Sequence, residues 1–382
     1  MLDIRFNVPY LSGRERQYID EVFLNGHFSG NGPFTKKVEI LLEEFLGAER
    51  VLLTHSCTAA LEMSSMVLGI GPGDEVLMPS FTFVTTASSI MRSGAKPVFC
   101  EVDENMLIDL DDLQRKITDR TKAILPVHYA GSAPNMDELS SICESNSLLM
   151  IEDSAQGLGS TWKGQRLGTF GKLGAISFHE TKNIHSGLGG CLVINDKSKI
   201  ERSEMIWERG TDRSAFFRGQ VDKYSWRELG SSFYPSEIQA AFLLAQLESL
   251  QENIALRKEI WTSYVESLTH HGERFGFRIL MPTEFCQHNF HMIALVMQSP
   301  EQADFVREFL CNNGVQAVIH YVPLHSSPMG EKLGYEPDSL PKTMFSSRCL
   351  IRLPLHHKIS REDVISISKI LEKSLKTFDL SR

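Results

Sequence analysis

Seven short apolar runs, spaced between segments with helical periodicity, constrain the fold of this chain more than any other feature. Most runs are apolar along their whole length, which is typical of strands covered on both faces. Helical segments lie at 35–47, 57–69 and 135–147. The alternation predicts an α/β fold with a mostly parallel seven-stranded sheet between helices. The runs are RVLLTH (50–55), DEVLMPS (74–80), KPVFCEV (96–102), AILPVHYA (123–130), LLMIED (148–153), AISFHE (175–180) and CLVIND (191–196).

The pattern changes after about residue 235, where a helical stretch at 235–268 begins. A smaller α+β segment follows, with strand candidates at 277–282, 291–297 and 314–321 and helices near 300–313 and 360–376. A chain of 382 residues is long for a single core. We therefore predict a large domain over 1–245, which includes an N-terminal arm, and a small C-terminal domain over 246–382. The segment 205–230 lacks periodicity and is predicted to be a long ordered loop.

Composition narrows the class of protein. The seven cysteines are odd in number and include no C-x-x-C pair, which argues for reduced thiols and against a zinc ribbon. The histidines show no ligand spacing, so no metal site is predicted. A net charge of −9 disfavours nucleic acid as a partner. No apolar stretch of membrane-spanning length and no signal-peptide block occur, so we expect a cytoplasmic protein without membrane contact.

Chemistry is expected beyond the carboxyl ends of the strands, where ligands bind in sheets of this kind. The first run gives way to Ser56, Cys57 and Thr58 at the start of a helix. This is either a phosphate site, because a helix N-terminus offers free N–H groups, or an ordinary N-cap. Phe81 and Phe83 flank the end of the second run. Either ring stacks on a flat ligand or belongs to the core.

Two charged residues follow wholly apolar runs. Asp153 closes the fifth run and needs a partner, either a protonated ring nitrogen or a structural salt bridge, and Gln156 lies close enough to reach the same ligand. Lys182 follows the sixth run. It is either a surface lysine or a desolvated amine able to form a Schiff base. Together, a phosphate cradle, a ring stack, a pyridinium partner and an aldehyde anchor are what pyridoxal phosphate (PLP) requires.

In eight blocks the chain resembles the sugar aminotransferases of the DegT/DnrJ/EryC1/StrS family, which belong to PLP fold type I. The resemblance implies transfer of the amino group of L-glutamate to C4 of a dTDP-linked ketosugar for cell-surface polysaccharide. It also implies a homodimer with the active site at the subunit interface. The blocks are FSGNGPFTKKVE (28–39), GDEVLMPSFTFVTTASSI (73–90), GAKPVFCEVD (94–103), PVHYAG (126–131), IEDSAQGLGSTWKGQRLGTFG (151–171), SFHETKN (177–183), SEIQAAFLLAQLE (236–248) and HYVPLH (320–325).

The resemblance also implies roles for individual residues. Lys182 binds PLP covalently and shuttles a proton, and Asp153 pairs with the pyridinium nitrogen. The remaining cofactor contacts are Gln156 at the ring hydroxyl, Phe83 stacked on the ring, and Cys57, Thr58 and Ser177 at the phosphate. Ser232 stands where family members usually have an asparagine that completes the phosphate site of the partner subunit. Cys57 and Leu188 also depart from the family pattern, which has glycine and glutamate there.

The sugar nucleotide is expected near 27–32, which contains Ser29, near 212–227, and near HYVPLH (320–325). Arg213 and Arg218 are either ligands of the diphosphate or part of a solvated charged loop. Tyr321 and His325 either line the sugar pocket or pack in the core.

Three rival functions remain open. A pyridoxamine-dependent 3-dehydratase would carry histidine in place of Lys182. Another nucleotide-sugar aminotransferase of the family would act at C3, on a UDP-linked sugar, or with gluco stereochemistry. A regulatory protein that kept the fold would be expected to lose Lys182 or Asp153, and both are present.

Overall fold

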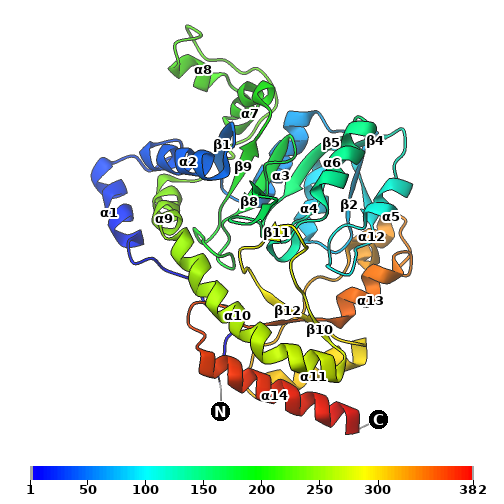
Figure 1. The fold of residues 1–382 in the computed structure, drawn as a ribbon. Coiled ribbons are helices and arrows are strands. Elements are labelled where there is room, and N and C mark those ends of the chain that lie inside the picture. Colours follow the sequence, from blue (N-terminus) through cyan, green and yellow to red (C-terminus); the bar gives the residue numbers. More distant parts are fainter. Residues whose placement is uncertain (1–2, 381–382) are drawn as a thin grey trace.

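All seven apolar runs contribute strands to one sheet, whose order is β1-β9-β8-β5-β4-β2-β3 (Figure 1). This is a computed structural model, and it describes residues 3–380. β9 runs antiparallel to β1 and β8, and the other neighbours pair in parallel. The predicted mostly parallel seven-stranded α/β sheet is confirmed. The strands are β1 (Arg50–Thr54), β2 (Glu75–Pro79), β3 (Lys96–Cys100), β4 (Thr121–Ile124), β5 (Leu149–Asp153), β8 (Leu173–Ser177) and β9 (Gly190–Ile194).

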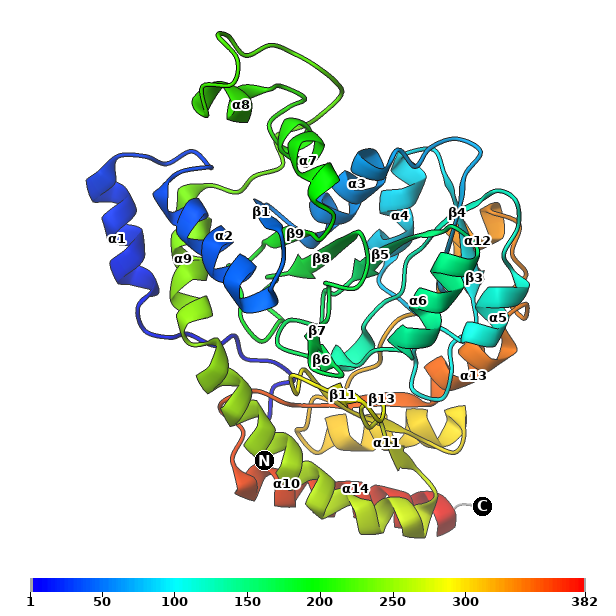
Figure 2. The same ribbon diagram turned by 45° about the horizontal axis from the view of Figure 1, so that its top comes forward.

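Helices cover both faces of this sheet (Figures 1 and 2). Leu52 and Leu192 pack with one set of helices, whereas Val51 and Val193 pack with the other. Because both faces are covered, the strands are apolar along their whole length. The first set is α3 (Cys57–Leu68), α4 (Val84–Arg92) and α7 (Ile200–Trp207), and the second is α2 (Pro33–Leu46), α5 (Leu110–Arg115), α6 (Met136–Ser145) and α9 (Glu237–Glu248), with α1 (Glu15–Asn25) against α9.

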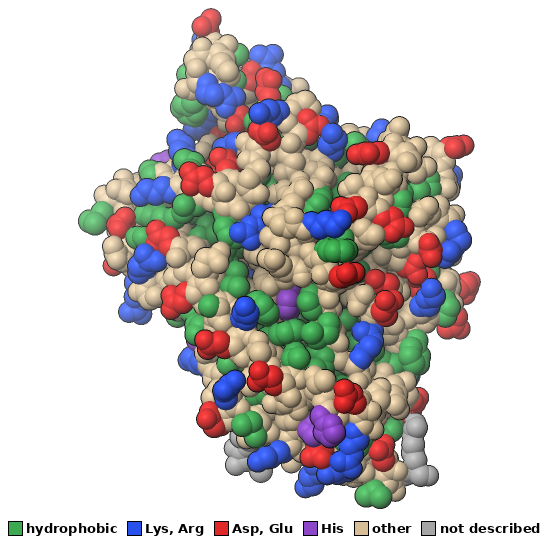
Figure 3. Space-filling model, viewed as in Figure 1, with side chains coloured by type: hydrophobic (Ala, Val, Ile, Leu, Met, Phe, Trp, Pro, Cys, Tyr) green, Lys and Arg blue, Asp and Glu red, His purple; other side chains and the backbone are tan. Residues whose placement is uncertain are grey.

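The C-terminal part packs three helices against a small antiparallel sheet, β10-β12-β13. The division at residues 245 and 246 stays a prediction. Figure 3 shows hydrophobic side chains gathered across the middle of one face, between the two parts. None of the helices within 3–380 is long and apolar enough to cross a bilayer. The elements are α10 (Leu250–Phe275), β10 (Arg278–Ile279), β12 (Ile293–Val296), α11 (Pro300–Asn312), α12 (Pro328–Lys332), α13 (Pro341–Cys349), β13 (Leu350–Leu353) and α14 (Arg361–Leu380), with β6 (Thr161–Trp162), β7 (Gln165–Arg166) and β11 (Cys286–Gln287) in a third sheet.

Two predicted elements are wrong in detail. The helical stretch at 235–268 is two helices, because Ser249 leaves helical geometry (φ −106°, ψ 8°) and its N–H bonds back to the last turn of α9. The segment 314–321 is not a strand. Val315 and Val318 make only isolated bridges, to Ile4 and Arg352, and the chain then turns through a positive φ of 35° at Tyr321.

The N-terminal segment 3–10 crosses between the two parts of the molecule. Ile4 exchanges backbone hydrogen bonds with the C-terminal part, from its N to the O of Gly314 (2.8 Å) and from the N of Gln316 to its O (3.0 Å). At the other end of the segment, the carbonyl of Tyr10 accepts a hydrogen bond from Gln246 Nε2 of α9 (3.0 Å). This segment is therefore hydrogen-bonded both to the C-terminal part and to α9, which covers the large sheet.

Residues 208–231, called here the projecting segment, leave the body of the molecule after α7 (Figures 1 and 2). They contain one short helix, α8 (Arg213–Phe217), and an antiparallel bridge between Thr211 and Trp226. The predicted loop at 205–230 therefore begins inside a helix, because α7 extends to Trp207.

Candidate active site

Lys182 lies in the connection between β8 and β9 rather than at the end of the strand, which stops at Ser177. The connection is a tight loop. The N–H of Glu180 bonds to the carbonyl of Gly187 (2.9 Å), and the N–H of Lys182 bonds to the carbonyl of His179 (2.9 Å). These bonds fix the backbone that carries Lys182, whose side chain is half-buried.

The surroundings of Lys182 favour its neutral amine. Desolvation lowers the pKa of Lys182. The nearby Cys57 and Asp153 raise this pKa, whereas the positive charge of Arg352 lowers it further. A lysine with a lowered pKa loses its proton more readily, and the neutral amine that results is a nucleophile. The same interactions show that Lys182 lies within electrostatic range of Asp153, as predicted for one shared site.

Asp153 is buried at the end of β5, with a relative exposure of 4%. Its Oδ2 accepts a hydrogen bond from Thr86 Oγ1 (2.7 Å), and its Oδ1 accepts one from the N–H of Ala155 (3.2 Å). Burial raises the pKa of Asp153, whereas the hydrogen bond from Thr86 and the charge of Lys182 lower it. Within residues 3–380 no lysine or arginine forms an ion pair with Asp153, so the structural salt bridge left open by the sequence is not formed there.

Aromatic residues form a wall beside these two groups. Phe83, just before α4, exposes 53% of its surface, and its ring centre lies 6.2 Å from that of Tyr321. Phe81 is fully buried and therefore belongs to the core. Gln156 donates from Nε2 to the hydroxyl of Tyr321 (3.3 Å) and accepts from the N–H of Ala130 (2.7 Å). Burial raises the pKa of Tyr321 to about 12, so its phenol stays protonated.

The start of α3 closes the site on another side. Ser56 is its N-cap, since its Oγ accepts the N–H three residues on (3.1 Å), and Cys57 and Thr58 are the first helical residues. Gly190 of β9 lies directly against this turn, because a Cβ there would be 2.3 Å from the N of Cys57. Ser177 pairs with Gly190 across β8 and β9. The three predicted phosphate residues thus lie around one helix N-terminus.

These residues fit PLP. A helix N-terminus with a glycine against it can accept a phosphate at close range. An exposed phenylalanine ring, a buried carboxylate and a lysine with a lowered pKa supply the other contacts. Lys182, Asp153, Gln156 and Phe83 would hold the aldehyde carbon, the ring nitrogen, the ring hydroxyl and the ring face.

Ser232 lies outside this group in the single chain. It is exposed, its Oγ accepts a hydrogen bond from Arg209 Nη2 (3.3 Å), and its backbone bridges to Glu208. Its role at the phosphate site of a second subunit stays a prediction.

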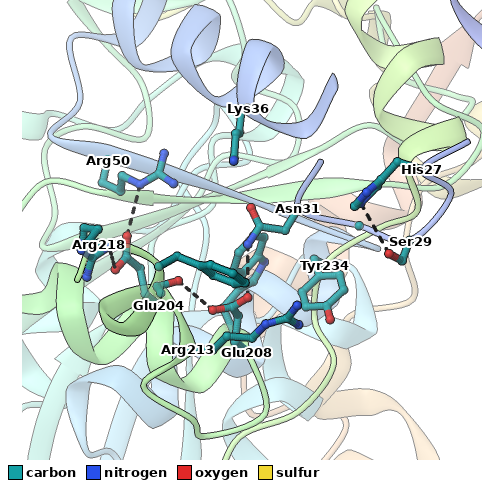
Figure 4. A pocket seen from close by; sticks show the side chains of 14 residues that line it. His27, Ser29, Asn31, Lys36, Arg50, Glu204, Glu208, Arg213, Arg218 and Tyr234 are labelled. Carbon is teal, nitrogen blue, oxygen red and sulfur yellow. Dashed lines mark hydrogen bonds and ion pairs between the residues drawn. The ribbon is translucent and has the colours of Figure 1, made fainter. Parts of the chain in front are cut away.

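Three predicted substrate residues share a different cavity, of about 470 Å³. Ser29 enters it before α2, whereas Arg213 and Arg218 enter it from α8 and just after it (Figure 4). Arg218 Nη1 is paired with Glu204 Oε2 (2.7 Å). Within 3–380 no carboxylate forms an ion pair with Arg213, whose guanidinium lies over the ring of Phe217 (5.1 Å). The other lining residues include His27, Asn31, Lys36, Arg50, Trp207, Glu208 and Tyr234.

The other two predicted substrate residues lie elsewhere. His325 is fully buried, with Nδ1 2.6 Å from Ser80 Oγ and Nε2 3.1 Å from the carbonyl of Pro337. These contacts favour the packing role that the sequence left open. Tyr321 joins the cofactor residues through Gln156.

Sequence reasoning missed two residues of this site. Thr86 holds Asp153, and its position in the first turn of α4, beyond the end of β2, was a usable signal. Arg352 is a charge inside the apolar run LIRLPL (350–355), the same signal that identified Asp153 and Lys182.

Comparisons with known proteins define the family. Residues 9–372 match the model of the DegT/DnrJ/EryC1/StrS aminotransferase family, and the chain belongs to this family. It is similar to a dTDP-4-dehydro-2,3,6-trideoxy-D-glucose 4-aminotransferase of Saccharopolyspora spinosa, with 32% identity over 97% of each chain. It is also similar to GDP-perosamine synthase of Escherichia coli O157:H7, with 29% identity over 96% of each.

The fold agrees with solved structures of such enzymes. Spr1654 of Streptococcus pneumoniae, assigned as a sugar aminotransferase and solved in its PMP form, aligns with a TM-score of 0.90 and 27% identity over 99% of each chain. The chain is therefore a PLP-dependent aminotransferase, and its α/β fold is that of this class of enzyme.

Proposed function

We propose that the protein transfers the amino group of L-glutamate to C4 of dTDP-4-keto-6-deoxy-D-glucose. The product would be dTDP-4-amino-4,6-dideoxy-D-galactose, an aminosugar for cell-surface polysaccharide such as enterobacterial common antigen. The observation that carries the aminotransferase chemistry is that Lys182, whose pKa is lowered, lies within electrostatic range of the buried Asp153. The sugar rests on three blocks that resemble dTDP-4-amino-4,6-dideoxygalactose transaminase: FHETKN (178–183), FFRGQVDKYSWRELGSSF (216–233) and VHYAG (127–131).

The roles follow from the positions of the side chains. When bound, PLP supplies an aldehyde that condenses with amines and a ring that withdraws electrons from the amine-bearing carbon. Lys182 holds the cofactor and moves a proton at the carbon that loses or gains the amino group. Asp153, held by Thr86, keeps a proton on the ring nitrogen. The wall of Phe83 and Tyr321 excludes water from one side.

The 470 Å³ cavity is the proposed site for the nucleotide diphosphate. Arg218 already pairs with Glu204, so it is the weaker candidate. Arg213 lies in the same cavity without a carboxylate partner in the part of the chain that the structure describes. We therefore assign the diphosphate to Arg213 first, since guanidinium groups bind phosphate oxygens through two hydrogen bonds.

We also propose that the protein is a homodimer. The projecting segment exposes large apolar side chains, with Trp226 77%, Leu229 74% and Phe217 66% exposed. Exposed apolar groups gathered on one protruding element are typical of an interaction surface. In one chain the cavity and the cofactor residues have no lining residue in common. A second copy that covers the projecting segment can bring one subunit's cavity to the other's cofactor.

The aminotransferase assignment is tested with Lys182→Ala. Turnover should be lost and the cofactor should no longer be covalently bound, because the amine that forms the covalent bond is removed. Lys172→Ala, at an exposed lysine just before β8, is the matched control and should keep both properties. Full turnover by Lys182→Ala would refute the assignment.

The sugar is tested with the intact enzyme. After incubation with L-glutamate, the cofactor should be in its amine form, and dTDP-4-keto-6-deoxy-D-glucose should restore the original absorbance. The product's proton couplings then distinguish galacto from gluco stereochemistry. If the absorbance is instead restored only by a GDP-linked sugar, a UDP-linked sugar or a 3-keto sugar, that result would support the rival assignment, another nucleotide-sugar aminotransferase. The relatives are named for different sugars, which favours this rival.

A further inference from the structure

The turn at residues 289–291, between β11 and β12, holds a bulky residue in a strained backbone conformation. Phe290 has a φ of 55°, in the left-handed region that residues other than glycine rarely adopt. From one side the turn is held by Arg257 of α10, which is buried and donates from Nε to the carbonyl of Phe290 (2.9 Å) and from Nη2 to the carbonyl of His291. Backbone strain persists only where the surroundings enforce it, and it is frequent at functional sites. The contacts on the other side of the turn identify what it holds in place.

Asn289, the first residue of this turn, ties it to the segment that follows Asp153. It is buried, with a relative exposure of 2%, and its Nδ2 donates to the carbonyls of Gln156 and Leu158 (2.8 Å each). Its Oδ1 lies against Gly131, where a Cβ would be only 2.3 Å away. Because Gln156 is the residue expected at the ring hydroxyl of PLP, the turn is fixed to the part of the site proposed for the cofactor ring.

Asn183, which follows Lys182 directly, is bound by the same turn. It is buried, its Nδ2 donates to the carbonyl of Asn289 (2.8 Å), and its Oδ1 accepts a hydrogen bond from His291 Nδ1 (2.9 Å). The backbone bonds from the N–H groups of Glu180 and Lys182 stay within the loop. The bonds of Asn183 instead join this loop to the turn, and through the turn to the residues around the cofactor ring.

We infer that Asn183 is a positioning residue, which uses the strained turn to hold Lys182 at a fixed place relative to the segment that carries Asp153. The inference rests on the role proposed for Lys182. An amine and a carboxylate that act on one ligand must keep their separation, because small misplacements of reacting groups slow reactions strongly. The strand pairing of β5 with β8 stops at Asp153 and Ala175, so it does not extend to the loop that carries Lys182.

His291 contributes a hydrogen bond to this arrangement and not a charge. Burial and the positive charge of Lys182 both lower the pKa of His291 well below its ordinary value, so the ring is neutral at neutral pH. Because the amide oxygen of Asn183 can only accept, the single ring proton lies on Nδ1. Replacement of His291 by leucine therefore removes a donor and leaves the net charge of the site unchanged.

The first test measures the pKa of the Lys182 amine in the full chain without PLP, from the pH dependence of its acetylation by acetic anhydride. Asn183→Ala should raise this pKa by at least about one unit, because a loop that is no longer held admits water around the amine. Asn195→Ala is the matched control, since it also removes two hydrogen bonds, to the carbonyls of Gly168 (3.1 Å) and Gly171 (2.8 Å), at the end of β9 farther from the Lys182 loop. It should lower the thermal midpoint and leave the pKa of Lys182 unchanged. An unchanged pKa in Asn183→Ala, or an equal rise in both variants, would overturn the inference.

Two substitutions at His291 separate this hydrogen bond from a general loosening of the loop. His291→Leu removes the donor to Asn183 and should raise the pKa of Lys182 as Asn183→Ala does. His291→Asn places an amide N–H at the position of Nδ1 and should restore most of the lowered pKa. Equal shifts in His291→Leu and His291→Asn would overturn the inference. The groups that act electrostatically on the Lys182 amine, none of which these variants replace, are Cys57, Asp153 and Arg352.

The second test follows the covalent bond between Lys182 and PLP, which borohydride makes permanent. Asn183→Ala, loaded with PLP, should fix its bound PLP to Lys182 at least about tenfold more slowly than Asn195→Ala, because the amine is no longer held in place. Equal rates would overturn the inference. If the unchanged enzyme fixes no PLP at Lys182, the proposed function fails, whereas a raised pKa of Lys182 in Asn183→Ala would still support the positioning role of Asn183.

Discussion

Replacing Thr86 with valine removes the hydroxyl that holds Asp153 while keeping the shape of the side chain. Thr86 Oγ1 lies 2.7 Å from Asp153 Oδ2, and both residues are buried. A hydrogen bond to a charged group contributes about 1.5–3 kcal/mol. Because this bond favours the ionised carboxylate, its loss raises the pKa of Asp153 further above its ordinary range. Less carboxylate is then ionised at any given pH.

The expected effect is weaker binding of PLP, because only ionised Asp153 pairs with the protonated ring nitrogen. The full loss of the hydrogen bond corresponds to about 10- to 150-fold in affinity. The loss should be larger at about pH 6 than at about pH 8, since low pH protonates the carboxylate. Absorbance of bound PLP, titrated into cofactor-free enzyme at both pH values, measures it.

Ser89→Ala is the matched control for this prediction. Ser89 lies on the same helix and donates to the carbonyl of Thr86 (3.1 Å), so its replacement removes a neutral hydrogen bond next to the same residue. PLP affinity should change by less than about threefold. If Thr86→Val binds PLP as well as the unchanged enzyme at both pH values, the hydroxyl does not keep Asp153 ionised and the reasoning fails.

Three further predictions concern stability and the shape of the site. Burial lowers the pKa of His288 to about 4. Below pH 6.5 the unfolded chain therefore takes up a proton that the folded chain does not. The free energy of unfolding decreases as the pH is lowered through this range. His288→Phe should reduce the loss in unfolding free energy between about pH 8 and pH 5 by about 2 kcal/mol, and an unchanged loss would contradict this. Gly190→Ala should weaken PLP binding, because its Cβ would lie 2.3 Å from the N of Cys57. Gly71→Ala is the control and should bind PLP normally, because its Cβ would lie 3.7 Å from its nearest neighbour. Equal PLP affinities of the two variants would refute the argument that a Cβ at Gly190 crowds the site. Glu237→Gln should lower the free energy of unfolding by about 2–3 kcal/mol in denaturant titrations, because Glu237 is fully buried and accepts the N–H groups that open α2; a loss below about 0.5 kcal/mol would count against this.

The large sheet could be predicted from the sequence because burial on both faces leaves a signal in every strand. Asp153 and Lys182 stood out for a related reason, since a charge next to a wholly apolar run needs a partner. Arg352 carries the same signal, but the segment around it was not recognised as a strand. Arg352 was therefore missed because its strand was not predicted, although a charge in an apolar run indicates a buried charge there as it does at Asp153 and Lys182.

Contacts between residues far apart in the sequence could not be predicted, because they depend on which strands are neighbours. Local sequence patterns do not determine the order of the strands in the sheet. Thr86 meets Asp153 because β2 and β5 both flank β4. Ser29 and Arg213 share a cavity because the segment before α2 and the projecting segment both line it. The break at Ser249 is also invisible locally, because apolar residues at helical spacing continue on both sides of it.

The segment at 3–10 has a consequence for synthesis of the chain on the ribosome. Its bridge partner Val315 follows Ile4 by 311 residues. At about 5–20 residues per second, Ile4 waits about 15–60 s before that partner exists. This segment is therefore made long before it can dock. The ring of Phe6 likewise cannot cover Arg352 until β13 has been made, so this contact joins two segments that are synthesised far apart in time.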